Sequence, residues 1–253
     1  MLQIIQRGVL ILMISKQLYS LQVKTKQNFE ENLEHLRNLI IQCNPDSIIL
    51  APEVCLTNFC YQKMDKANEF AKIATQTLLT LSSDRTIIIT MIEKYRNGFY
   101  NNLKVFHKGE LLHKQSKHKL FLLGNEHLHF QSGDVEEITP FKVEGLICGA
   151  LNCFELRFIE LWQRLKGCDL IFVPAQWGRE RKDNFETLTK ALAITTQSFV
   201  LASSGANDTC AKGSAIITPS GIATIDDSKE IINTKVNFST ITQVRKSLNI
   251  GLS

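Results

Sequence analysis

Residues 143–158 read VEGLICGALNCFELRF, a run of small and apolar residues followed by a segment in which charged residues appear at helical spacing. The first part predicts a buried strand over Val143–Asn152, and the second predicts a helix over Glu155–Lys166 that Gly167 ends. Cys153 then lies at the turn from strand to helix. A thiol at such a turn is presented at a sheet edge and faces the positive end of a helix, so we expect an exposed thiol with a lowered pKa.

The same alternation of short apolar runs and amphipathic helices continues along the chain. Asn28 predicts a helix N-cap, with Glu31 completing a capping box. The turn pairs Asn97-Gly98 and Lys108-Gly109 predict hairpins. We expect strands at residues 18–23, 47–51, 86–92, 99–106, 111–121, 143–152, 169–174, 199–203, 213–218 and 222–225, and helices at 28–44, 68–81, 155–166 and 184–197. Because no repeat or Pro/Gly-rich linker divides the sequence, we predict one α/β domain built as a layered sandwich of mixed sheets.

The composition is that of an ordinary globular protein. Of the 253 residues, 44% are hydrophobic and 21% are charged. The net charge of +4 originates in residues 1–28, which hold four basic and no acidic side chains, whereas the remainder has 25 of each kind. Because the body of the chain is neutral, we expect no nucleic-acid partner.

The cysteines and the start of the chain indicate in which cellular compartment the protein is expected. The seven cysteines are odd in number and include no Cys-x-x-Cys pair, which favours buried thiols in a reducing cytoplasm over a disulfide framework. Gly8–Ile14 is apolar and follows Arg7, but seven residues are too few to cross a bilayer and no signal-cleavage site follows. We therefore expect no membrane association, an appendage at residues 1–15 before a single domain at 16–253, and Met13 as an alternative start.

Two further segments put an ionisable residue at the end of a predicted strand. Glu53 follows Pro52 and the apolar run 47–51, a position at which charged groups of α/β proteins face the ligand crevice. Lys117 and Lys119 lie two apart on a predicted strand, so both can face one side. A nucleophile, a base and a cation at three strand ends are typical of acyl-transfer chemistry. A solvated carboxylate and a solvated basic strand are the alternative interpretations.

Other residue sets are weaker candidates. Cys148 has no charged residue nearby, and we therefore favour Cys153 as the reactive thiol. The six histidines leave a Cys–His protease pairing open, although none lies in a segment that indicates one. No metal is expected, because two pairs of possible ligands have spacings that do not match a structural zinc site: His127 with His129, and Cys55 with Cys60.

Together these segments resemble the nitrilase, or carbon–nitrogen hydrolase, superfamily over residues 18–245. The matching motifs are Ala51-Pro52-Glu53, Lys117-His118-Lys119-Leu120-Phe121, Gly124-Asn125-Glu126 with Phe130 and Gly133-Asp134, the run Gly149–Leu161 around Cys153, Pro174-Ala175-Gln176-Trp177, and Gly213-Ser214 with Pro219-Ser220-Gly221. The chain departs from the family pattern at Asn152, Phe154, Ile159 and the segment Leu192–Thr195, where the family often has Arg-Ala-x-Glu.

The resemblance implies a four-layer α-β-β-α sandwich of two mixed sheets, and a reaction that needs neither metal nor cofactor. It makes Cys153 the nucleophile and Glu53 the general base. Lys117, rather than Lys119, takes the position of the catalytic lysine. Three further residues are implied to line or support the site: Glu126, Phe154 and Trp177.

The resemblance also implies the class of substrate. We expect hydrolysis of a small amide through a thioester on the cysteine, with release of ammonia. An N-carbamoyl amine or acid is the second substrate class and a nitrile the third. The family also implies a homo-oligomer, a dimer or larger. A catalytically silent module of the same fold, which binds a ligand or a partner, is the alternative from another class.

Overall fold

Two six-stranded mixed sheets lie at the centre of the fold in the computed structural model, which describes residues 14–95 and 98–252. The first sheet has the order β12 (Ile231–Asn237), β1 (Ser15–Leu21), β2 (Ser47–Leu50), β3 (Thr86–Tyr95), β4 (Gly98–His107) and β5 (Glu110–Ser116). The second has the order β11 (Ala223–Ile225), β10 (Ala215–Ile217), β9 (Phe199–Ser204), β8 (Leu170–Ala175), β7 (Leu146–Ala150) and β6 (Phe141–Val143). In each sheet three neighbouring strands are parallel, namely β1–β2–β3 and β7–β8–β9, and the outer pairings are antiparallel.

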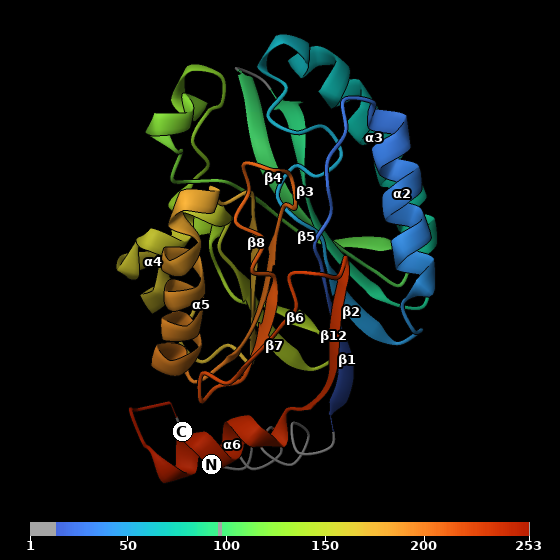
Figure 1. Ribbon diagram of the computed structural model, residues 1–253. Helices are drawn as coiled ribbons and strands as arrows, with labels where there is room; N and C mark the ends of the chain where they lie inside the picture. The colour runs from blue at the N-terminus through green and yellow to red at the C-terminus, as the bar shows by residue number, and fades with distance from the viewer. Residues whose placement is uncertain (1–13, 96–97, 253) are drawn as a thin grey trace.

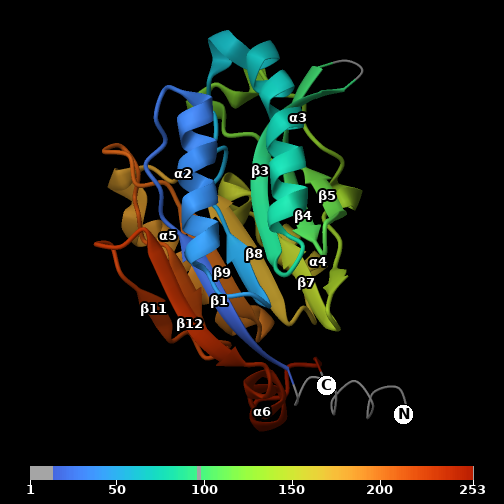
Figure 2. The ribbon, with the colours of Figure 1, turned by 90° about the vertical axis from the view of Figure 1, so that its right-hand side faces the viewer.

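Helices cover the outer faces of the two sheets (Figures 1 and 2). The first sheet is covered by α2 (Phe29–Gln42) and α3 (Met64–Leu81), and the second by α4 (Ile159–Arg164) and α5 (Lys182–Thr196). A last helix, α6 (Ser239–Ser247), lies beyond one end of the sheets in Figure 1. The predicted four-layer α-β-β-α sandwich is therefore confirmed. Short 3-10 helices complete the fold: η1 (Tyr61–Lys63), η2 (Leu122–Gly124), η3 (Glu126–Leu128), η4 (Val135–Glu137), η5 (Cys153–Arg157) and η6 (Arg179–Arg181).

Three apolar cores separate the four layers. On β3, Ile87 and Ile89 pack outward in the core shared with α2 and α3, whereas Ile88 packs inward between the two sheets. Phe172 on β8 belongs to the same inter-sheet core, and Val200 on β9 packs on the other side of the second sheet, in the core shared with α4 and α5. Because alternate residues of these strands face two different cores, both faces need apolar side chains, and the strands are continuously apolar.

Several local predictions are confirmed. The side chain of Asn28 accepts the N–H of Glu31 at 2.9 Å, so α2 begins where the cap predicts. The hairpin between β4 and β5 turns at Lys108 and Gly109, with positive φ angles of 51° and 76°. β3 pairs antiparallel with β4 up to Tyr95 and Gly98, but Asn97 of the predicted turn pair lies outside the described residues, as do residues 1–13 of the predicted appendage.

Other boundaries were predicted wrongly. The strand expected at 111–121 ends at Ser116. The strand expected at Val143–Asn152 is instead two strands, β6 and β7, joined by a turn at Glu144 and Gly145, which both have positive φ. The helix expected at 155–166 is the 3-10 helix η5 followed by the six-residue helix α4. Neither β12 nor α6 was predicted, because polar residues break the apolar pattern in both.

Candidate active site

Parallel strands of both sheets deliver the candidate residues to one end of the sandwich. Glu53 follows β2 after the buried residues Ala51 and Pro52, Cys153 follows β7, and Gln176 follows β8. Lys117 follows β5, which runs antiparallel to β4. Because the carboxyl ends of parallel strands meet at the same edge of a sheet, residues that are distant in sequence come together there.

Glu53 is the centre of this group and is fully buried. Its Oε1 accepts hydrogen bonds from Lys117 Nζ at 2.7 Å and from Asn101 Nδ2 at 2.8 Å. Its Oε2 accepts the backbone N–H of Gln176 at 3.3 Å. A buried carboxylate needs such partners, because an unpaired buried charge costs several kcal/mol. The carboxylate is therefore fixed from both sheets.

Lys117 is also fully buried, and it joins two carboxylates. Besides Glu53, its Nζ contacts Glu126 Oε1 at 2.8 Å, and Glu126 Oε2 accepts the N–H of Phe121 at 3.0 Å. Burial lowers the pKa of Lys117, but the two carboxylates outweigh burial, so the net pKa is raised and the side chain is an ammonium. Burial raises the pKa of Glu126, whereas the charge of Lys117 acts to lower it.

Lys119 does not share this environment, so the prediction that both lysines can face one side is wrong. Its ammonium lies 3.5 Å from Glu160 in a pair whose carboxylate is 62% exposed, and 4.8 Å from the centre of the Phe158 ring. The strand pattern no longer applies here, because β5 has ended at Ser116. Of the two lysines, Lys117 is the one that contacts Glu53 and Glu126.

Two neighbouring aromatic side chains, Phe59 and Tyr61, lie near the lysine. The ring centre of Phe59 lies 5.9 Å from Lys117 Nζ. Tyr61 stacks on His129 with ring centres 4.0 Å apart and donates its hydroxyl to the carbonyl of Gly124 at 2.8 Å. Burial and, next, Glu126 raise the pKa of Tyr61 to about 12, which keeps the phenol protonated. These side chains reduce the access of water to the ion pairs.

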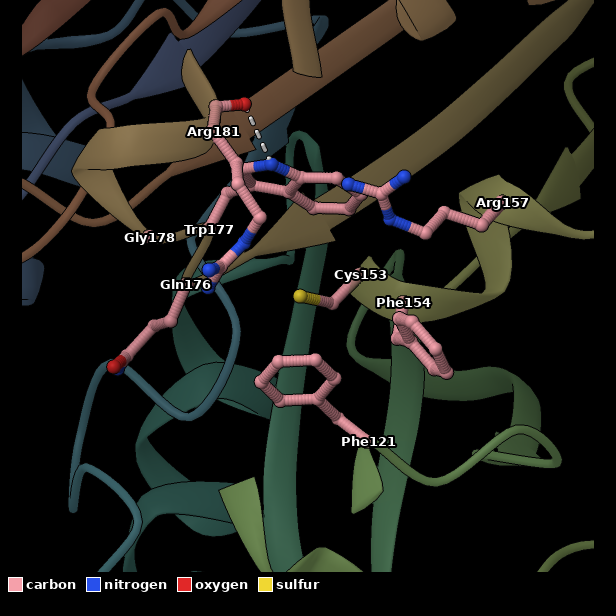
Figure 3. A pocket seen from close by; sticks show the side chains of 8 residues that line it. All are labelled: Phe121, Cys153, Phe154, Arg157, Gln176, Trp177, Gly178 and Arg181. Carbon is pink, nitrogen blue, oxygen red and sulfur yellow. Dashed lines mark hydrogen bonds between the residues drawn. The ribbon is translucent and has the colours of Figure 1, made fainter. Parts of the chain in front are cut away.

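Cys153 begins η5 with a φ of 53°, a left-handed backbone conformation that residues other than glycine rarely adopt. Its sulfur points into a pocket between aromatic and polar side chains (Figure 3). The expectation of an exposed thiol with a lowered pKa is wrong. Only 8% of Cys153 is exposed, and burial and then the Glu53 carboxylate raise its pKa, although Lys117 opposes this. The physical reason is that η5 is a single short 3-10 helix and α4 begins only at Ile159.

The pocket beside the sulfur has about 290 Å³ of empty space, counted with its open mouth, and its lining includes the predicted Phe154 and Trp177. Two guanidinium groups also line it: that of Arg157 lies 5.0 Å from the centre of a Trp177 ring, and that of Arg181 lies 5.7 Å from the centre of the Phe121 ring. Within residues 14–95 and 98–252, neither guanidinium forms a salt bridge. Two guanidinium groups that directly contact no carboxylate of the described residues therefore line the pocket.

Sequence reasoning missed three residues of this site. Gln176 was quoted only as part of a motif, and Arg181 was not singled out. Asn101 gave no signal at all, because its role depends on β4 lying across from β2 through β3. Among the described residues, no three His, Cys, Asp or Glu side chains are grouped so that they could hold a metal ion, and no helix there is long and apolar enough to cross a membrane.

Comparison with known proteins identifies the family. A family model for carbon–nitrogen hydrolases matches residues 17–246. The chain belongs to this family. This carbon–nitrogen hydrolase is 27% identical over 217 residues to the 2-oxoglutaramate amidase of Bacillus subtilis (strain 168), covering 80% of this chain and 83% of the relative. It is 26% identical over 209 residues to the omega-amidase YafV of Escherichia coli (strain K12), covering 77% and 78%.

A solved structure supports the same fold. Nit3 of Saccharomyces cerevisiae, a member of branch 10 of the nitrilase superfamily, superposes with a TM-score of 0.84 at 20% sequence identity. The superposition covers 95% of this chain and 97% of Nit3. The family model, together with this shared fold, confirms the recognition of the nitrilase superfamily from sequence motifs.

Proposed function

We propose that this carbon–nitrogen hydrolase cleaves small amides through a thioester on Cys153, with Glu53 as the general base and Lys117 as the cation that stabilises the oxyanion. The observation that carries the proposal is the buried chain of contacts from Glu126 through Lys117 to Glu53. This chain lies at the end of the sandwich where Cys153 lines a pocket. A base held this firmly beside a protonated thiol can remove its proton as the thiol attacks.

The first half-reaction transfers the acyl group. Glu53 takes the thiol proton as the sulfur bonds to the amide carbonyl, and the negative charge moves to the carbonyl oxygen. The Lys117 ammonium and the backbone N–H of Phe154 are the donors that we assign to this oxyanion. When the C–N bond breaks, the proton on Glu53 goes to the departing nitrogen, which leaves as ammonia. The acyl group stays on sulfur as a thioester.

The second half-reaction restores the enzyme. Glu53 removes a proton from water, and the resulting hydroxide bonds to the thioester carbonyl. The C–S bond then breaks, the carboxylic acid leaves, and the thiolate takes the proton back from Glu53. Glu126 orients the Lys117 ammonium throughout both steps, because it is the second carboxylate in contact with Nζ.

The charge of the pocket favours an amide that carries a separate carboxylate. Arg157 and Arg181 supply two positive charges beside the sulfur, and a guanidinium binds a carboxylate with two parallel hydrogen bonds. Monoamides of short dicarboxylic acids fit this pocket better than neutral amides. N-carbamoyl amino acids also carry a carboxylate and are the second candidate substrate class. A homo-oligomer remains a prediction.

The test is ammonia release from a panel of amides by the purified enzyme and by Cys153→Ala. The panel contains monoamides of dicarboxylic acids, neutral aliphatic amides and N-carbamoyl amino acids. We expect release from the first group and none with the variant, while mass spectrometry of the acid-quenched wild type detects the acyl group on Cys153. Turnover that persists in Cys153→Ala contradicts the assignment. A lack of turnover with every compound favours the silent binding module.

A further inference from the structure

Glu155 is a fully buried carboxylate that joins the two segments carrying the proposed nucleophile and the proposed catalytic lysine. Its Oε2 accepts the backbone N–H of Asn152 at 2.6 Å, and its Oε1 accepts the backbone N–H of His118 at 2.6 Å. Asn152 directly precedes Cys153, and His118 directly follows Lys117. One side chain thus spans the two segments through the peptide groups next to both residues.

Neither segment is held at this point by a strand of its sheet. In the second sheet β7 ends at Ala150, and in the first sheet β5 ends at Ser116, before the lysine. One backbone bond attaches the Lys117 segment to its own sheet, from the N–H of Lys117 to the carbonyl of Asn101 at 2.8 Å, and the Lys117 side chain adds its bond to Glu53. The bonds to Glu155 tie it instead to the cysteine loop of the other sheet. The distance between the two segments therefore depends strongly on this carboxylate.

The bonding pattern fits a carboxylate better than any other side chain of this size. Both oxygens face backbone N–H groups, which are donors only. Burial raises the pKa of Glu155, whereas the N–H groups of Asn152 and His118 oppose this by favouring the charged form. A glutamine at this position would have one oxygen and one NH2 group, so it could accept from only one of the two segments.

We propose that Glu155 is a positioning residue for catalysis, which sets the separation of Cys153 Sγ and Lys117 Nζ by clamping the cysteine loop of the second sheet to the lysine segment of the first. This inference rests on the proposed roles of Cys153 and Lys117. It assigns to Glu155 no contact with the substrate. Its effect on the reaction acts through the geometry of the two residues that it joins.

Glu155→Gln tests the clamp. We expect kcat to fall by about 10²-fold, the order of loss that a misplacement of about 1 Å can produce. We also expect the rate at which iodoacetamide alkylates Cys153 to change, because the thiol moves relative to Glu53 and Lys117. Glu155→Asp keeps the charge on a side chain that is one methylene shorter, so it should lower kcat less than Glu155→Gln does. It also serves if the glutamine variant does not fold.

The matched control is Asp169→Asn. Asp169 is another fully buried carboxylate, and its Oδ2 accepts the N–H of Ile147 at 2.8 Å near the start of β7, far along the strand from Cys153. This variant removes a buried negative charge that lies 3.8 Å from Arg245, so it should lower the thermal unfolding midpoint but leave the kcat of the folded enzyme and the alkylation rate unchanged. It thereby separates positioning from a general loss of stability.

The outcomes distinguish the clamp from the proposed function. If both Glu155 variants fold and keep the wild-type kcat and alkylation rate while Cys153→Ala is inactive, the clamp is wrong and the proposed chemistry stands. If Cys153→Ala is itself active, the proposed function fails. If Asp169→Asn lowers kcat as much as Glu155→Gln, the effect is one of stability and the clamp is again wrong.

Discussion

Lys117 Nζ lies 2.7 Å from Glu53 Oε1, and both side chains are fully buried. The second carboxylate, Glu126, contacts the same ammonium at 2.8 Å, so two negative charges share one positive charge inside the protein. Such an arrangement is costly unless each group keeps its partner. The contact that positions the proposed base is therefore also a contact on which the stability of this end of the sandwich depends.

Replacing the buried lysine should be far more damaging than replacing its exposed neighbour. Lys117→Ala removes an oxyanion donor, which typically costs about 10²- to 10³-fold in kcat. It also leaves two buried carboxylates without a counterion, a loss of about 3–5 kcal/mol in the free energy of unfolding. Lys119→Ala is the control, because a surface pair contributes only about 0–1 kcal/mol. Steady-state kinetics and urea unfolding check both. If the order reverses, the lysine assignment is wrong.

The thiol should titrate at higher pH than an ordinary cysteine in the free enzyme. Burial and the Glu53 carboxylate both disfavour the thiolate, so the pKa of Cys153 rises above the reference value of 9.0. The rate of alkylation by iodoacetamide should then have its midpoint above this pH. Glu53→Gln removes the carboxylate charge that raises this pKa, so the midpoint should move to lower pH while turnover falls for lack of a base. A midpoint below that of an ordinary thiol in the wild type is the contrary result.

Arg181 should control the affinity for the substrate carboxylate. Hydrogen bonds to charged groups contribute about 1.5–3 kcal/mol, so Arg181→Ala should lower kcat/KM for an acidic amide by about 10- to 100-fold, mainly through KM. The rate with a neutral amide of similar length should change little. Arg179→Ala is the matched control, because Arg179 is exposed and does not line the pocket. An equal loss for acidic and neutral amides would exclude the proposed carboxylate contact.

A single methyl group should reproduce part of this effect. A Cβ added at Gly178 would lie 2.6 Å from a terminal nitrogen of Arg181, so the guanidinium has to move. The backbone at Gly178 has a φ of −69°, which alanine adopts without strain. Gly178→Ala should therefore raise KM for acidic amides and leave the unfolding midpoint nearly unchanged. An unaltered KM would mean that the observed position of Arg181 does not matter for binding.

The sequence predicted the regular elements well where one physical rule decides them. The apolar run of β3 requires burial on both faces, and Asn28 fixes the start of α2 through its own hydrogen bond. β12, which pairs with β1 at the edge of the first sheet, was not predicted because its polar residues interrupt the apolar pattern. The two-residue turn at Glu144 and Gly145 was not predicted either, because it lies within an apolar stretch.

The sequence predicted that these candidate residues lie close together, but it did not predict their environment. Glu53, Lys117, Cys153 and Glu126 were chosen by their positions after strands and by the family motifs, and the structure brings them to one end of the sandwich. The thiol was expected to be exposed because the sequence does not reveal what folds over a turn. Asn101 and Arg181 depend on contacts between segments far apart in the chain, and local patterns do not contain that information.

The proposed base and nucleophile belong to different sheets, with Glu53 following β2 and Cys153 following β7. Their alignment depends on the inter-sheet core and on a few bonds across it, such as that from Gln115 Nε2 to the carbonyl of Ala150 at 3.2 Å. Sliding of one sheet over the other would separate the reacting groups without breaking a single strand pairing. Hydrostatic pressure or mild denaturant should accordingly abolish the activity of the enzyme while its far-ultraviolet circular dichroism is still that of the folded protein.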